Sequence, residues 1–586
     1  MSTRTDRMRR ARPVIALAAM AFVIGVAVGS SSGGDSSDEL AARFVAAWAG
    51  GHYASVYASL DRRSRREVSE LQLAERCRHA LRTATAIATR VTGHPRGISG
   101  GMIAVPVRVQ TRLFGTLRLA FALRVTGGAD GGVVWSRSAE FPGLRPGERL
   151  TRDLRLPPRA TLLARDGSVL AEGTPSAAGQ RPSPLGAAAE GVVGEVGPPP
   201  AASARTLEAE GVPTGAIVGV SGLEQALDAS LRGTPGGELL AQSEAPGGGT
   251  RVLAAAAPRP DPSVRTTVSP AIQQAAVSAL GGQLGGVVAM RPDGQILAVA
   301  GLGIDDLQPP GSTFKMVTVS GVLQAGVAGL GSTFPYATSA TLDGVKLNNA
   351  GGEECGGSLE LAFAVSCNSV FAPLGVKLGA PALVAMAERY GFNQPSGVPG
   401  AVESTLPPAS QIRGELDLGS TAIGQGQVLA SALEMATVAA TIGDGGRRPQ
   451  PTFMLGQAPA VVATATSRAV ADTMRRLMIA VVREGTGTAA AISGVTVAGK
   501  TGTAELGTCP STGAAEEQTG SEGPSSEASS CGGPAGEAAN TDAWFAAFAP
   551  AVHPRIVVGV MLVKDGAGGA TAAPVARQVL EAGLAG

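Results

Sequence analysis

Lysine is scarce in this sequence. Only five of the 48 basic residues in the 586-residue chain are lysine, and the rest are arginine. Arginine keeps its proton at biological pH whereas lysine can release it, so each lysine in such a chain is informative. The five positions are Lys315, Lys346, Lys377, Lys500 and Lys564. Lys315 is singled out because the residues around it, from Phe314 onward, are apolar and predict the start of a buried helix.

Histidine and metal-binding cysteine patterns are lacking as well. Residues 262–586 contain one histidine, His553, in a predicted turn between strands, which disfavours a Ser-His-Asp hydrolase. The five cysteines form no C-x-x-C motif and no His/Cys metal spacing, so neither zinc nor another cofactor is expected. Outside the cytoplasm some cysteines can pair, and Cys509 and Cys531 are the candidate pair because they share one low-complexity segment.

The chain also lacks an excess of charge. A net charge of +1 gives no reason to expect a nucleic-acid or strongly acidic partner. The 82 glycines and 39 prolines predict many loops, but 44% hydrophobic residues can still form real cores. Because 586 residues are too many for one ordinary domain, we expect three or four folded units.

The N-terminus is typical of a targeting segment. Five arginines lie within residues 4–12, and an apolar run follows over 13–29. This charge distribution predicts a cytoplasmic tail over 1–12, a single-pass transmembrane signal anchor over 13–29, and everything from about Ser30 onward outside the cytoplasm. Ala27-Val28-Gly29 can also be interpreted as a small-residue cleavage site, so a removed signal peptide stays an alternative.

The first folded unit is predicted over 36–150. Apolar residues at Leu40, Phe44, Val45 and Trp48 have the spacing of an amphipathic helix, and a second helical stretch covers about 71–87. Residues 102–128 alternate between apolar and polar, as in a half-exposed antiparallel sheet. Helices followed by a sheet indicate a small α+β domain.

The next segment, 151–261, contains a predicted hairpin whose turn is Arg165-Asp166-Gly167. Residues 174–210 are rich in Ala, Gly and Pro, which predicts a loose loop or linker. We take 151–261 as a separate unit, because a different pattern begins near residue 262.

The last segment, 262–586, predicts a sheet whose strands come from distant parts of the chain. Residues 285–301 form two predicted strands around the turn 291–294, and two further strands lie within 542–563, before a closing helix. A long helical stretch separates these strand pairs. Residues 507–540 have too few apolar residues to fold alone and predict a mobile surface loop.

Three short motifs carry the chemistry. Ser312 and Lys315, three residues apart on a helix, lie on one face, so a lysine with a lowered pKa can act as the base that activates the serine. Pro309 to Gly311 fit a sharp turn that leaves the Ser312 hydroxyl at the positive end of the helix. Ser-x-x-Lys alone is a weak signal, because a capping serine beside a solvated lysine has the same pattern.

Two further motifs strengthen the catalytic interpretation of Ser312 and Lys315. Ser366-Cys367-Asn368 is the single Ser-x-Asn in the chain, and Lys500-Thr501-Gly502 is the single Lys-Thr-Gly. Three motifs in this order resemble the active-site signature of penicillin-binding proteins and serine β-lactamases. Stretches such as "PPGSTFK", "FAVSCNSVFAPLGVKLG" and "AGKTGTAE" are similar to class B penicillin-binding proteins over about 150–586. Residues 36–150, with "FVAAWAGGHYASVY", resemble the NTF2-like N-terminal domain of one branch of that family.

The resemblance implies a multidomain α+β protein. Its parts would be a membrane anchor, an NTF2-like α+β domain, a pedestal or dimerisation-type domain over 151–261, and a β-lactamase-like transpeptidase domain over 262–586. In the last of these, helices flank an antiparallel sheet. The implied activity is that of a serine-type D,D-transpeptidase, which cross-links peptidoglycan stem peptides through an acyl-enzyme on Ser312 and is acylated by β-lactams.

The resemblance also implies roles for the motif residues. Ser366 would relay a proton between Lys315 and the leaving amine, and Asn368 would orient the substrate and the lysine. Lys500 and Thr501 would meet a substrate carboxylate, and Gly502 would let the substrate approach the strand. The remaining expectation is that the backbone N–H groups of Ser312 and Thr503 form the oxyanion hole.

Three alternatives share this fold: a β-lactamase, a β-lactam-binding sensor and a catalytically silent cell-wall scaffold. A class A β-lactamase places a glutamate four residues before an asparagine, and none of the five asparagines here has one. A sensor would need several membrane spans and an intracellular domain. A silent scaffold is disfavoured because every motif residue is present. Expected partners are stem peptides, β-lactams, the cytoplasmic membrane, and cell-division or elongation proteins.

Overall fold

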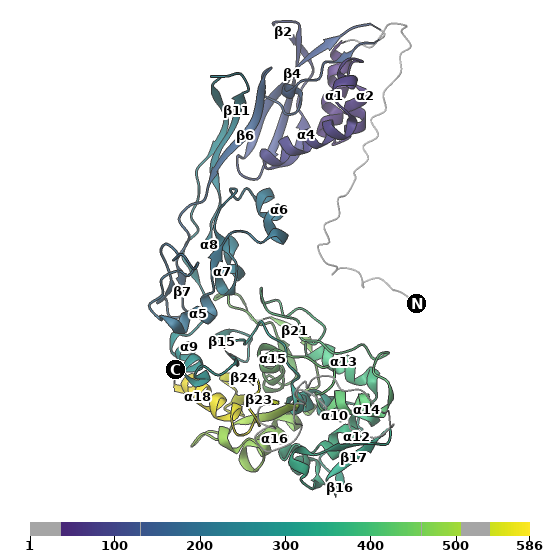
Figure 1. Ribbon diagram of the computed structural model, residues 1–586, viewed down its shortest axis with the longest axis vertical. Coiled ribbons are helices and arrows are strands. Elements are labelled where there is room, and N and C mark those ends of the chain that lie inside the picture. The colour runs from purple at the N-terminus through teal and green to yellow at the C-terminus, as the bar shows by residue number, and fades with distance from the viewer. Residues whose placement is uncertain (1–36, 129, 459, 506–539, 586) are drawn as a thin grey trace, which may run out of the picture. The chain divides into compact units, whose positions relative to one another are not determined.

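The structure is a computed structural model that describes residues 37–128, 130–458, 460–505 and 540–585 (Figure 1). The predicted anchor, the candidate pair Cys509 and Cys531, and the predicted loop up to residue 539 lie outside the described residues. Internal contacts divide the chain into two units. The first contains the described residues up to 111 together with 116–150 and 241–251, and the second contains 112–115, 151–240 and 252 onward.

The first unit begins with helices and continues with a sheet, in the order that the sequence pattern predicts. The helices are α1 (Ser37–Ala49), α2 (Tyr53–Ala58), α3 (Ser64–Glu67) and α4 (Glu70–Thr83). The strands are β1 (Ala86–Val91), β2 (Arg96–Ile98), β3 (Met102–Thr111), β4 (Thr116–Thr126) and β5 (Gly132–Val133), and a 3₁₀ turn, η1 (Arg137–Ala139), follows them. The predicted second helix extends too far, because Ile87 already belongs to β1.

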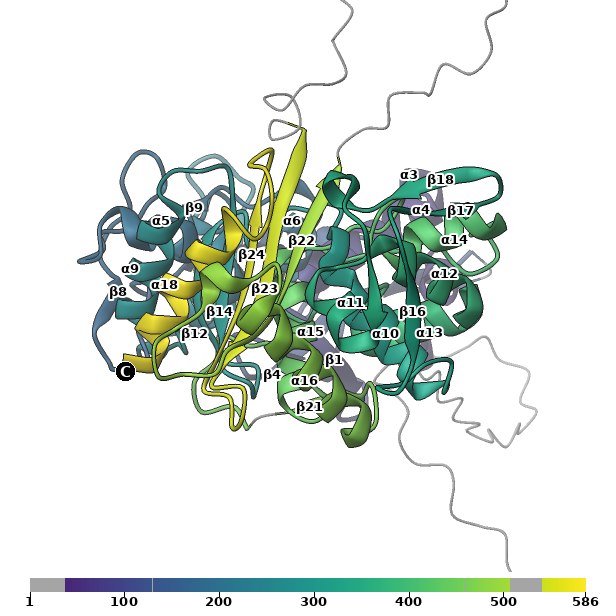
Figure 2. The same ribbon diagram turned by 90° about the horizontal axis from the view of Figure 1, so that it is seen from below.

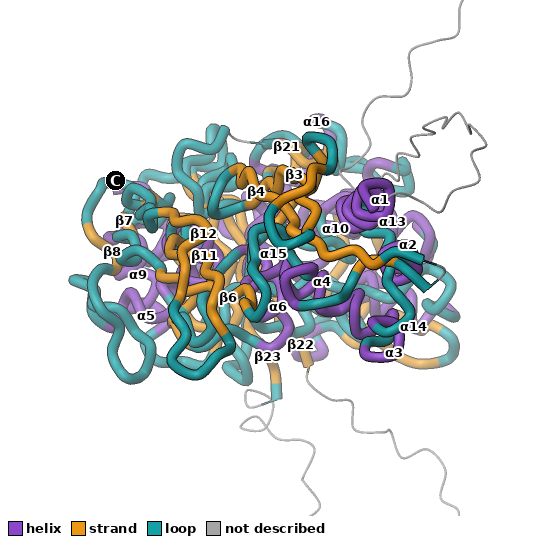
Figure 3. Tube along the Cα trace, turned by 90° about the horizontal axis from the view of Figure 1, so that it is seen from above, coloured by secondary structure: helices purple, strands orange, loops and turns teal. Residues whose placement is uncertain are grey.

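Aromatic residues fill the core of this unit. Strands β1, β3, β4 and β5 are neighbours in that order, β2 pairs with β3, and α1 packs on β1, β3 and β4. Figure 3 shows β3 and β4 side by side. The ring of Trp48 on α1 meets Phe121 of β4 edge to face at 4.9 Å and Phe141 at 6.2 Å. Its indole N–H donates to the Glu140 carbonyl at 3.1 Å, so the buried polar group is satisfied.

The second unit starts with short elements. They are β7 (Leu162–Leu163), β8 (Val169–Ala171), α5 (Ala187–Val193), β9 (Val196–Gly197), α6 (Ala201–Glu210), β10 (Val218–Gly219), α7 (Gly222–Ala226), α8 (Asp228–Leu231) and β13 (Val264–Arg265). The predicted hairpin at 165–167 is present, since β7 and β8 pair antiparallel. The prediction of a loose linker over 174–210 is wrong: α5 packs apolar side chains into the core, which Ala-rich composition alone did not reveal.

A buried ion-pair network holds this segment together. The Glu224 carboxylate is fully buried and accepts hydrogen bonds from Arg159 at 2.6 Å and from Arg181 at 2.9 Å. Arg159 also donates to Asp228 at 2.9 Å. Because an unpaired buried charge is costly, removal of one partner would destabilise the segment more than removal of one partner of a surface ion pair.

The strands β6 (Glu148–Arg155), β11 (Gly236–Ser243) and β12 (Thr250–Ala256) form a separate three-stranded sheet in the order β12-β11-β6.

A five-stranded antiparallel sheet forms the centre of residues 262–585, as the sequence predicts. Its order is β15 (Ile296–Gly301), β14 (Gly285–Met290), β24 (Ile556–Leu562), β23 (Thr541–Ala549) and β22 (Ala498–Glu505). The two predicted hairpins are β14 with β15 and β23 with β24, and they pair with each other through β14 and β24. Strand β22 is therefore an edge strand.

Helices cover both faces of this sheet (Figure 2). One face carries α9 (Pro270–Leu280) and α18 (Ala572–Ala585), the predicted closing helix. The short turn η4 (Thr488–Ala490) packs against α18 on that first face. The helices on the other side are η2 (Gly311–Phe314), α10 (Lys315–Gln324), η3 (Ala350–Gly352), α11 (Leu359–Ala364), α12 (Asn368–Leu378), α13 (Ala380–Tyr390), α14 (Gly414–Ala422), α15 (Ala432–Gly443) and α16 (Arg468–Glu484). The smaller strands are β16 (Thr333–Ala337), β17 (Ser339–Leu342), β18 (Val345–Asn348), β19 (Cys355–Ser358), β20 (Arg447–Pro449) and β21 (Val461–Thr464).

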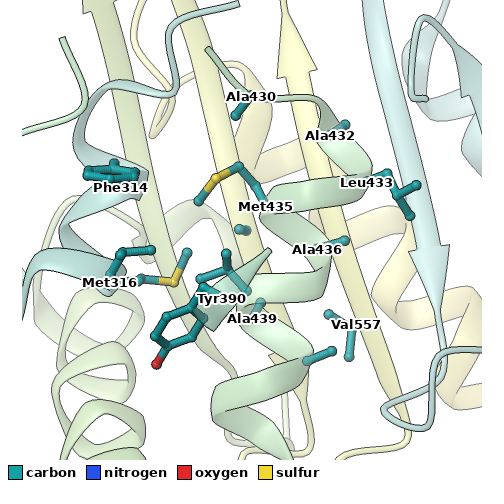
Figure 4. Packing of buried hydrophobic residues seen from close by; sticks show 14 of the residues in the cluster. Phe314, Met316, Tyr390, Ala430, Ala432, Leu433, Met435, Ala436, Ala439 and Val557 are labelled. Atoms are coloured by element: carbon teal, nitrogen blue, oxygen red, sulfur yellow. The ribbon is translucent and has the colours of Figure 1, made fainter. Parts of the chain in front are cut away.

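Small residues let α15 lie close to the sheet. Figure 4 shows Ala432, Ala436 and Ala439 on this helix, with Val557 of β24 nearby and Phe314 and Met316 also in the cluster. A Cβ atom on Gly559 of β24 would meet the Ala432 carbonyl oxygen at 2.3 Å. Residues of α15 and Phe314, the last residue of the turn η2 that contains Ser312, thus belong to one close-packed buried cluster.

A helix can cross a membrane only if it is long and apolar, and this applies to the helices of the described ranges. No single helix there is both long and apolar enough to cross a membrane. Helices α12 and α13, bent by 101° at the break between them, meet the length and composition criteria together.

Candidate active site

Ser312 and Lys315 lie where η2 passes into α10. Ser312 is in the 3₁₀ turn and partly exposed, while Lys315 opens the α-helix and is fully buried. The two side chains lie on one face, as predicted: the Lys315 Nζ atom is 2.9 Å from the Ser312 Oγ atom. The tight first turn brings the two side chains together because residues three apart eclipse in a 3₁₀ helix.

The other partners of Lys315 define its hydrogen-bonding geometry. Its Nζ atom is 2.7 Å from the Ser366 carbonyl oxygen and 2.6 Å from the Asn368 Oδ1 atom. Both oxygens can only accept, so they take two N–H bonds of the amine. A neutral amine then has its lone pair left for the Ser312 O–H. The geometry therefore suits an amine that removes the serine proton.

The surroundings of Lys315 favour the neutral form. Burial holds the pKa of its ammonium well below the usual range, and the nearby Lys500 charge lowers the pKa further. The amine lies 5.6 Å from the centre of the Phe371 ring, and Phe314 and Met316 beside it are fully buried. None of the hydrogen-bond partners recorded for Lys315 in the described residues is a carboxylate, which would have raised its pKa.

Ser366 and Asn368 flank the turn between α11 and α12. Ser366 has φ of 63°, the left-handed region that a non-glycine residue seldom adopts, and its side chain is thereby turned toward the lysines. Asn368 is the first residue of α12, and its side-chain amide donates to the Asn348 carbonyl at 2.9 Å. That bond fixes the amide so that its oxygen faces Lys315.

A disulfide that the sequence patterns did not reveal supports this turn. Cys367, between Ser366 and Asn368, is bonded to Cys355 at the start of β19. Cys367 is fully buried, and Cys77 is the one free cysteine among the described residues. The two cysteines lie 12 residues apart with no C-x-x-C or other familiar spacing, so their pairing could be recognised only from the fold.

Lys500, Thr501, Gly502 and Thr503 lie on the edge strand β22. The Lys500 Nζ atom donates to the Ser366 Oγ atom at 2.8 Å and to the Thr501 carbonyl at 3.1 Å. Burial lowers the pKa of Lys500 to about 7. The sequence reasoning assigned this lysine to a substrate carboxylate and missed its contact with Ser366, because the contact joins residues 134 positions apart. Its contact with a substrate stays a prediction.

Two glycines let β22 lie against the nucleophile turn. A Cβ atom on Gly502 would meet the Pro310 carbonyl oxygen at 2.6 Å, and one on Gly311 would meet the Thr503 carbonyl oxygen at 2.6 Å. Any larger residue at either position would push the strand from the turn. Gly502 therefore has a packing role here, next to the role in substrate approach that the sequence predicts.

The structure brings all the predicted site residues together. Ser312, Lys315, Ser366, Asn368 and Lys500 form one connected hydrogen-bond network, and Thr501, Gly502 and Thr503 line the adjoining strand. His553 lies apart from them, in the exposed turn between β23 and β24, as predicted. In the described part of the chain, no cluster of three or more His, Cys, Asp or Glu residues could hold a metal ion.

Comparison with known families agrees with this geometry. Residues 285–581 match the family model described as "Penicillin binding protein transpeptidase domain", and residues 175–254 match the one described as "Penicillin-binding Protein dimerisation domain". The first match covers about half of the chain and includes all three motifs.

Curated relatives and solved structures are similar to the same region. Peptidoglycan D,D-transpeptidase PbpA of Mycolicibacterium smegmatis is 34% identical over 388 residues, which are 55% of this chain and 72% of that protein. A D,D-transpeptidase domain from Eggerthella lenta has a TM-score of 0.55 and 29% identity, with 73% of this chain and 98% of that chain covered. The penicillin G acyl-enzyme complex of penicillin-binding protein A from Mycobacterium tuberculosis has a TM-score of 0.53 and 27% identity, with 73% and 99% covered.

The chain therefore belongs to the penicillin-binding protein transpeptidase family and carries the dimerisation and transpeptidase domains of that family. Its structural neighbours are class B penicillin-binding proteins, as the sequence resemblance predicted.

Proposed function

We propose that this protein is a serine-type peptidoglycan D,D-transpeptidase that β-lactams acylate on Ser312. The observation that carries the proposal is the placement of Lys315, whose amine has two carbonyl acceptors and faces the Ser312 hydroxyl at 2.9 Å. Relatives named peptidoglycan D,D-transpeptidase and neighbours solved as β-lactam acyl-enzymes support it.

The acylation step follows from these contacts. The Ser312 oxygen attacks the carbonyl carbon of the penultimate D-Ala while its proton passes to Lys315. The C–N bond to the terminal D-Ala then breaks, and the departing amine takes a proton from Lys315 through the Ser366 hydroxyl, 3.3 Å from Nζ. An ester on Ser312 and free D-Ala result. In a β-lactam the C–N bond that breaks is that of the lactam ring.

In the second half-reaction Ser312 is the leaving group and an amine is the nucleophile. The amine of another stem peptide attacks the ester carbonyl and gives its proton to the neutral Lys315. The bond from carbon to the Ser312 oxygen breaks, and the serine recovers a proton. A new peptide bond, the cross-link, is the product. Lys500 keeps a positive charge beside Ser366 and so favours a hydroxyl oriented to carry the proton.

The test is to label the purified full-length protein with a fluorescent penicillin, beside Ser312→Ala, and to follow both formation and loss of the adduct. A transpeptidase gives an adduct that persists for many minutes and is absent from the Ser312→Ala variant. Rapid loss of the label would instead favour a β-lactamase. Absence of label from the unmodified protein would overturn an acyl-enzyme mechanism and favour a silent scaffold.

We also propose that the chain is held in the cytoplasmic membrane by residues 13–29, with its catalytic domains outside the cytoplasm. The arginines before this segment and the apolar run support this. The boundaries 36–150, 151–261 and 262–586 are proposed as domains, the first of them NTF2-like. That first domain would serve as a spacer or as a surface for a cell-division or elongation partner. Protease accessibility of intact cells and spheroplasts would test the orientation.

A further inference from the structure

Thr486 is a residue at the active site that none of the three motifs includes. It lies in the turn "EGTG" that follows α16, and its side-chain hydroxyl is 2.6 Å from the hydroxyl of Thr501 on β22. The same hydroxyl is 3.3 Å from the carbonyl oxygen of Ala364, the last residue of α11 and two residues before Ser366. Thr486 thus connects the strand of the Lys-Thr-Gly motif with the helix that leads into the Ser-x-Asn motif.

The backbone around Thr486 is held closely in place. Its N–H donates to the same Ala364 carbonyl at 3.0 Å. A Cβ atom on Gly485 would meet that carbonyl oxygen at 2.2 Å, and one on Gly569 would meet the Thr486 carbonyl oxygen at 2.2 Å. Both approaches are possible only for glycine. The hydroxyl of Thr486 is therefore presented to Thr501 from a fixed backbone.

The hydrogens available at this contact decide whether Thr501 can donate to a substrate. Each threonine hydroxyl has one hydrogen, and the Ala364 carbonyl can only accept. If Thr486 donates to Ala364, the 2.6 Å contact needs the hydrogen of Thr501, which is then unable to bind a substrate. If Thr486 donates to Thr501, the hydrogen of Thr501 is free to point at an incoming carboxylate.

We propose that Thr486 is a positioning residue that sets the direction of the Thr501 hydroxyl. On arrival of a substrate carboxylate, the Thr486 hydroxyl rotates from Ala364 to Thr501, and Thr501 donates its own hydrogen to the carboxylate. A hydroxyl that accepts one hydrogen bond becomes a better donor in another, so the chain from Thr486 to the carboxylate is cooperative. The proposal rests on the proposed function, in which Thr501 meets the substrate carboxylate.

The difference in burial between Thr486 and Thr501 favours a positioning role for Thr486 over a packing role. Thr501 is 5% exposed, whereas Thr486 is an exposed residue. An exposed hydroxyl has water as an alternative partner and contributes little to stability, so the short bond to a buried neighbour is better explained by the direction it gives to that neighbour. The methyl group of a valine would fill the same space without offering a hydrogen bond.

The test uses two acyl donors that differ in one group. Both are thioesters of the same acyl peptide; the leaving group of one ends in a carboxylate and that of the other in the neutral carboxamide. For Thr486→Val in the full-length protein we expect KM for the carboxylate donor to rise roughly 3- to 10-fold with kcat unchanged. KM for the carboxamide donor should not change. Thr486→Ser should restore the lower KM, and Thr486→Ala should match Thr486→Val.

The matched control is Thr488→Val, the same change at an exposed threonine two residues away, which should leave both donors unaffected. An equal rise in KM for both donors in Thr486→Val would overturn the proposal and favour a structural role. A Thr486→Val variant with the same KM values as the unmodified protein would also overturn it. Failure of the proposed function is a different result: the unmodified protein would then form no penicillin adduct and turn over neither thioester.

Discussion

The Nζ atom of Lys500 lies 2.8 Å from the Oγ atom of Ser366. The same hydroxyl is 3.3 Å from Lys315, so Ser366 sits between two buried amines. Burial lowers the pKa of both lysines, and the nearby charge of Lys500 lowers the pKa of Lys315 further. The site therefore works with the two amines in different protonation states.

The first prediction concerns the pH dependence of acylation. At low pH Lys315 carries a proton and cannot remove that of Ser312, so the rate should rise with pH through its lowered pKa. Above about pH 7 Lys500 loses its charge, and the rate should fall. The second-order rate constant for a fluorescent penicillin, measured from pH 5 to 10, should be bell-shaped. In Lys500→Gln the whole profile should be lower and lack the descending limb. A rate that climbs steadily to pH 10 would contradict this assignment.

The second prediction concerns the proton transfer by Lys315. Lys315→Arg should lose about 100- to 10,000-fold in acylation rate, nearly as much as Lys315→Ala, because arginine keeps the charge and cannot release its proton. Stopped-flow labelling with penicillin measures the rate. Lys377→Arg, on the far end of α12, is the matched control and should behave as the unmodified protein. Near-normal acylation in Lys315→Arg would exclude Lys315 as the base.

The third prediction concerns the disulfide. Because Cys355 and Cys367 close a loop that ends between Ser366 and Asn368, reduction should release the turn that holds both side chains. Loss of a cross-link over a loop of this size costs about 3 kcal/mol of unfolding free energy. The melting temperature and the acylation rate should both fall in reductant. A double variant, Cys355→Ala with Cys367→Ala, should not respond to reductant, and a response there would implicate another cysteine.

The fourth prediction concerns Glu434 on α15. Burial raises the pKa of this carboxyl to about 8, despite the opposing charge of Arg448, and its Oε1 atom has no hydrogen-bond partner. Between pH 4.5 and 8 the folded protein holds a proton that the unfolded chain has released. The contribution of Glu434 to the unfolding free energy is therefore complete below pH 4.5. It declines by about 1.4 kcal/mol per pH unit from there to about pH 8.

Glu434→Gln removes that titration and should leave a protein whose unfolding free energy depends less on pH in this window. Chemical denaturation at several pH values gives the comparison. Glu415→Gln, at an exposed glutamate on α14, is the control and should keep the slope of the unmodified protein. Parallel pH curves for Glu434→Gln and the unmodified protein would show that the carboxyl is ionised in the fold.

Local patterns predicted the elements that depend on local chemistry. The turn around Asp293 and Gly294 predicted the pairing of β14 with β15, and the alternation along β3 predicted the sheet that contains β3 and β4. The reactive residues were found from three short motifs because each motif needs its own spacing on one element. The sequence also predicted that strands from both ends of the segment share one sheet, but it did not predict their order in the sheet.

Contacts between distant segments could not be predicted in this way. The bond of Lys500 to Ser366, the pairing of Cys355 with Cys367, and the contact of Thr486 with Thr501 all depend on how β22, α11 and α16 pack. Helix α5 was missed for a related reason, because its alanines are uninformative until tertiary burial gives one face a role. Sequence periodicity describes a residue's neighbours along the chain and not those across the fold.

The edge position of β22 has a consequence for inhibitor resistance. A ligand that pairs with an edge strand binds backbone N–H and C=O groups, which no side-chain substitution can delete. The spacing between β22 and the turn of Ser312 depends on Gly502 and Gly311, because a Cβ atom on either would lie only 2.6 Å from a carbonyl oxygen of the facing segment. Resistant variants should therefore arise by displacement of the strand from the nucleophile, through packing changes behind β22, more readily than by loss of a direct contact.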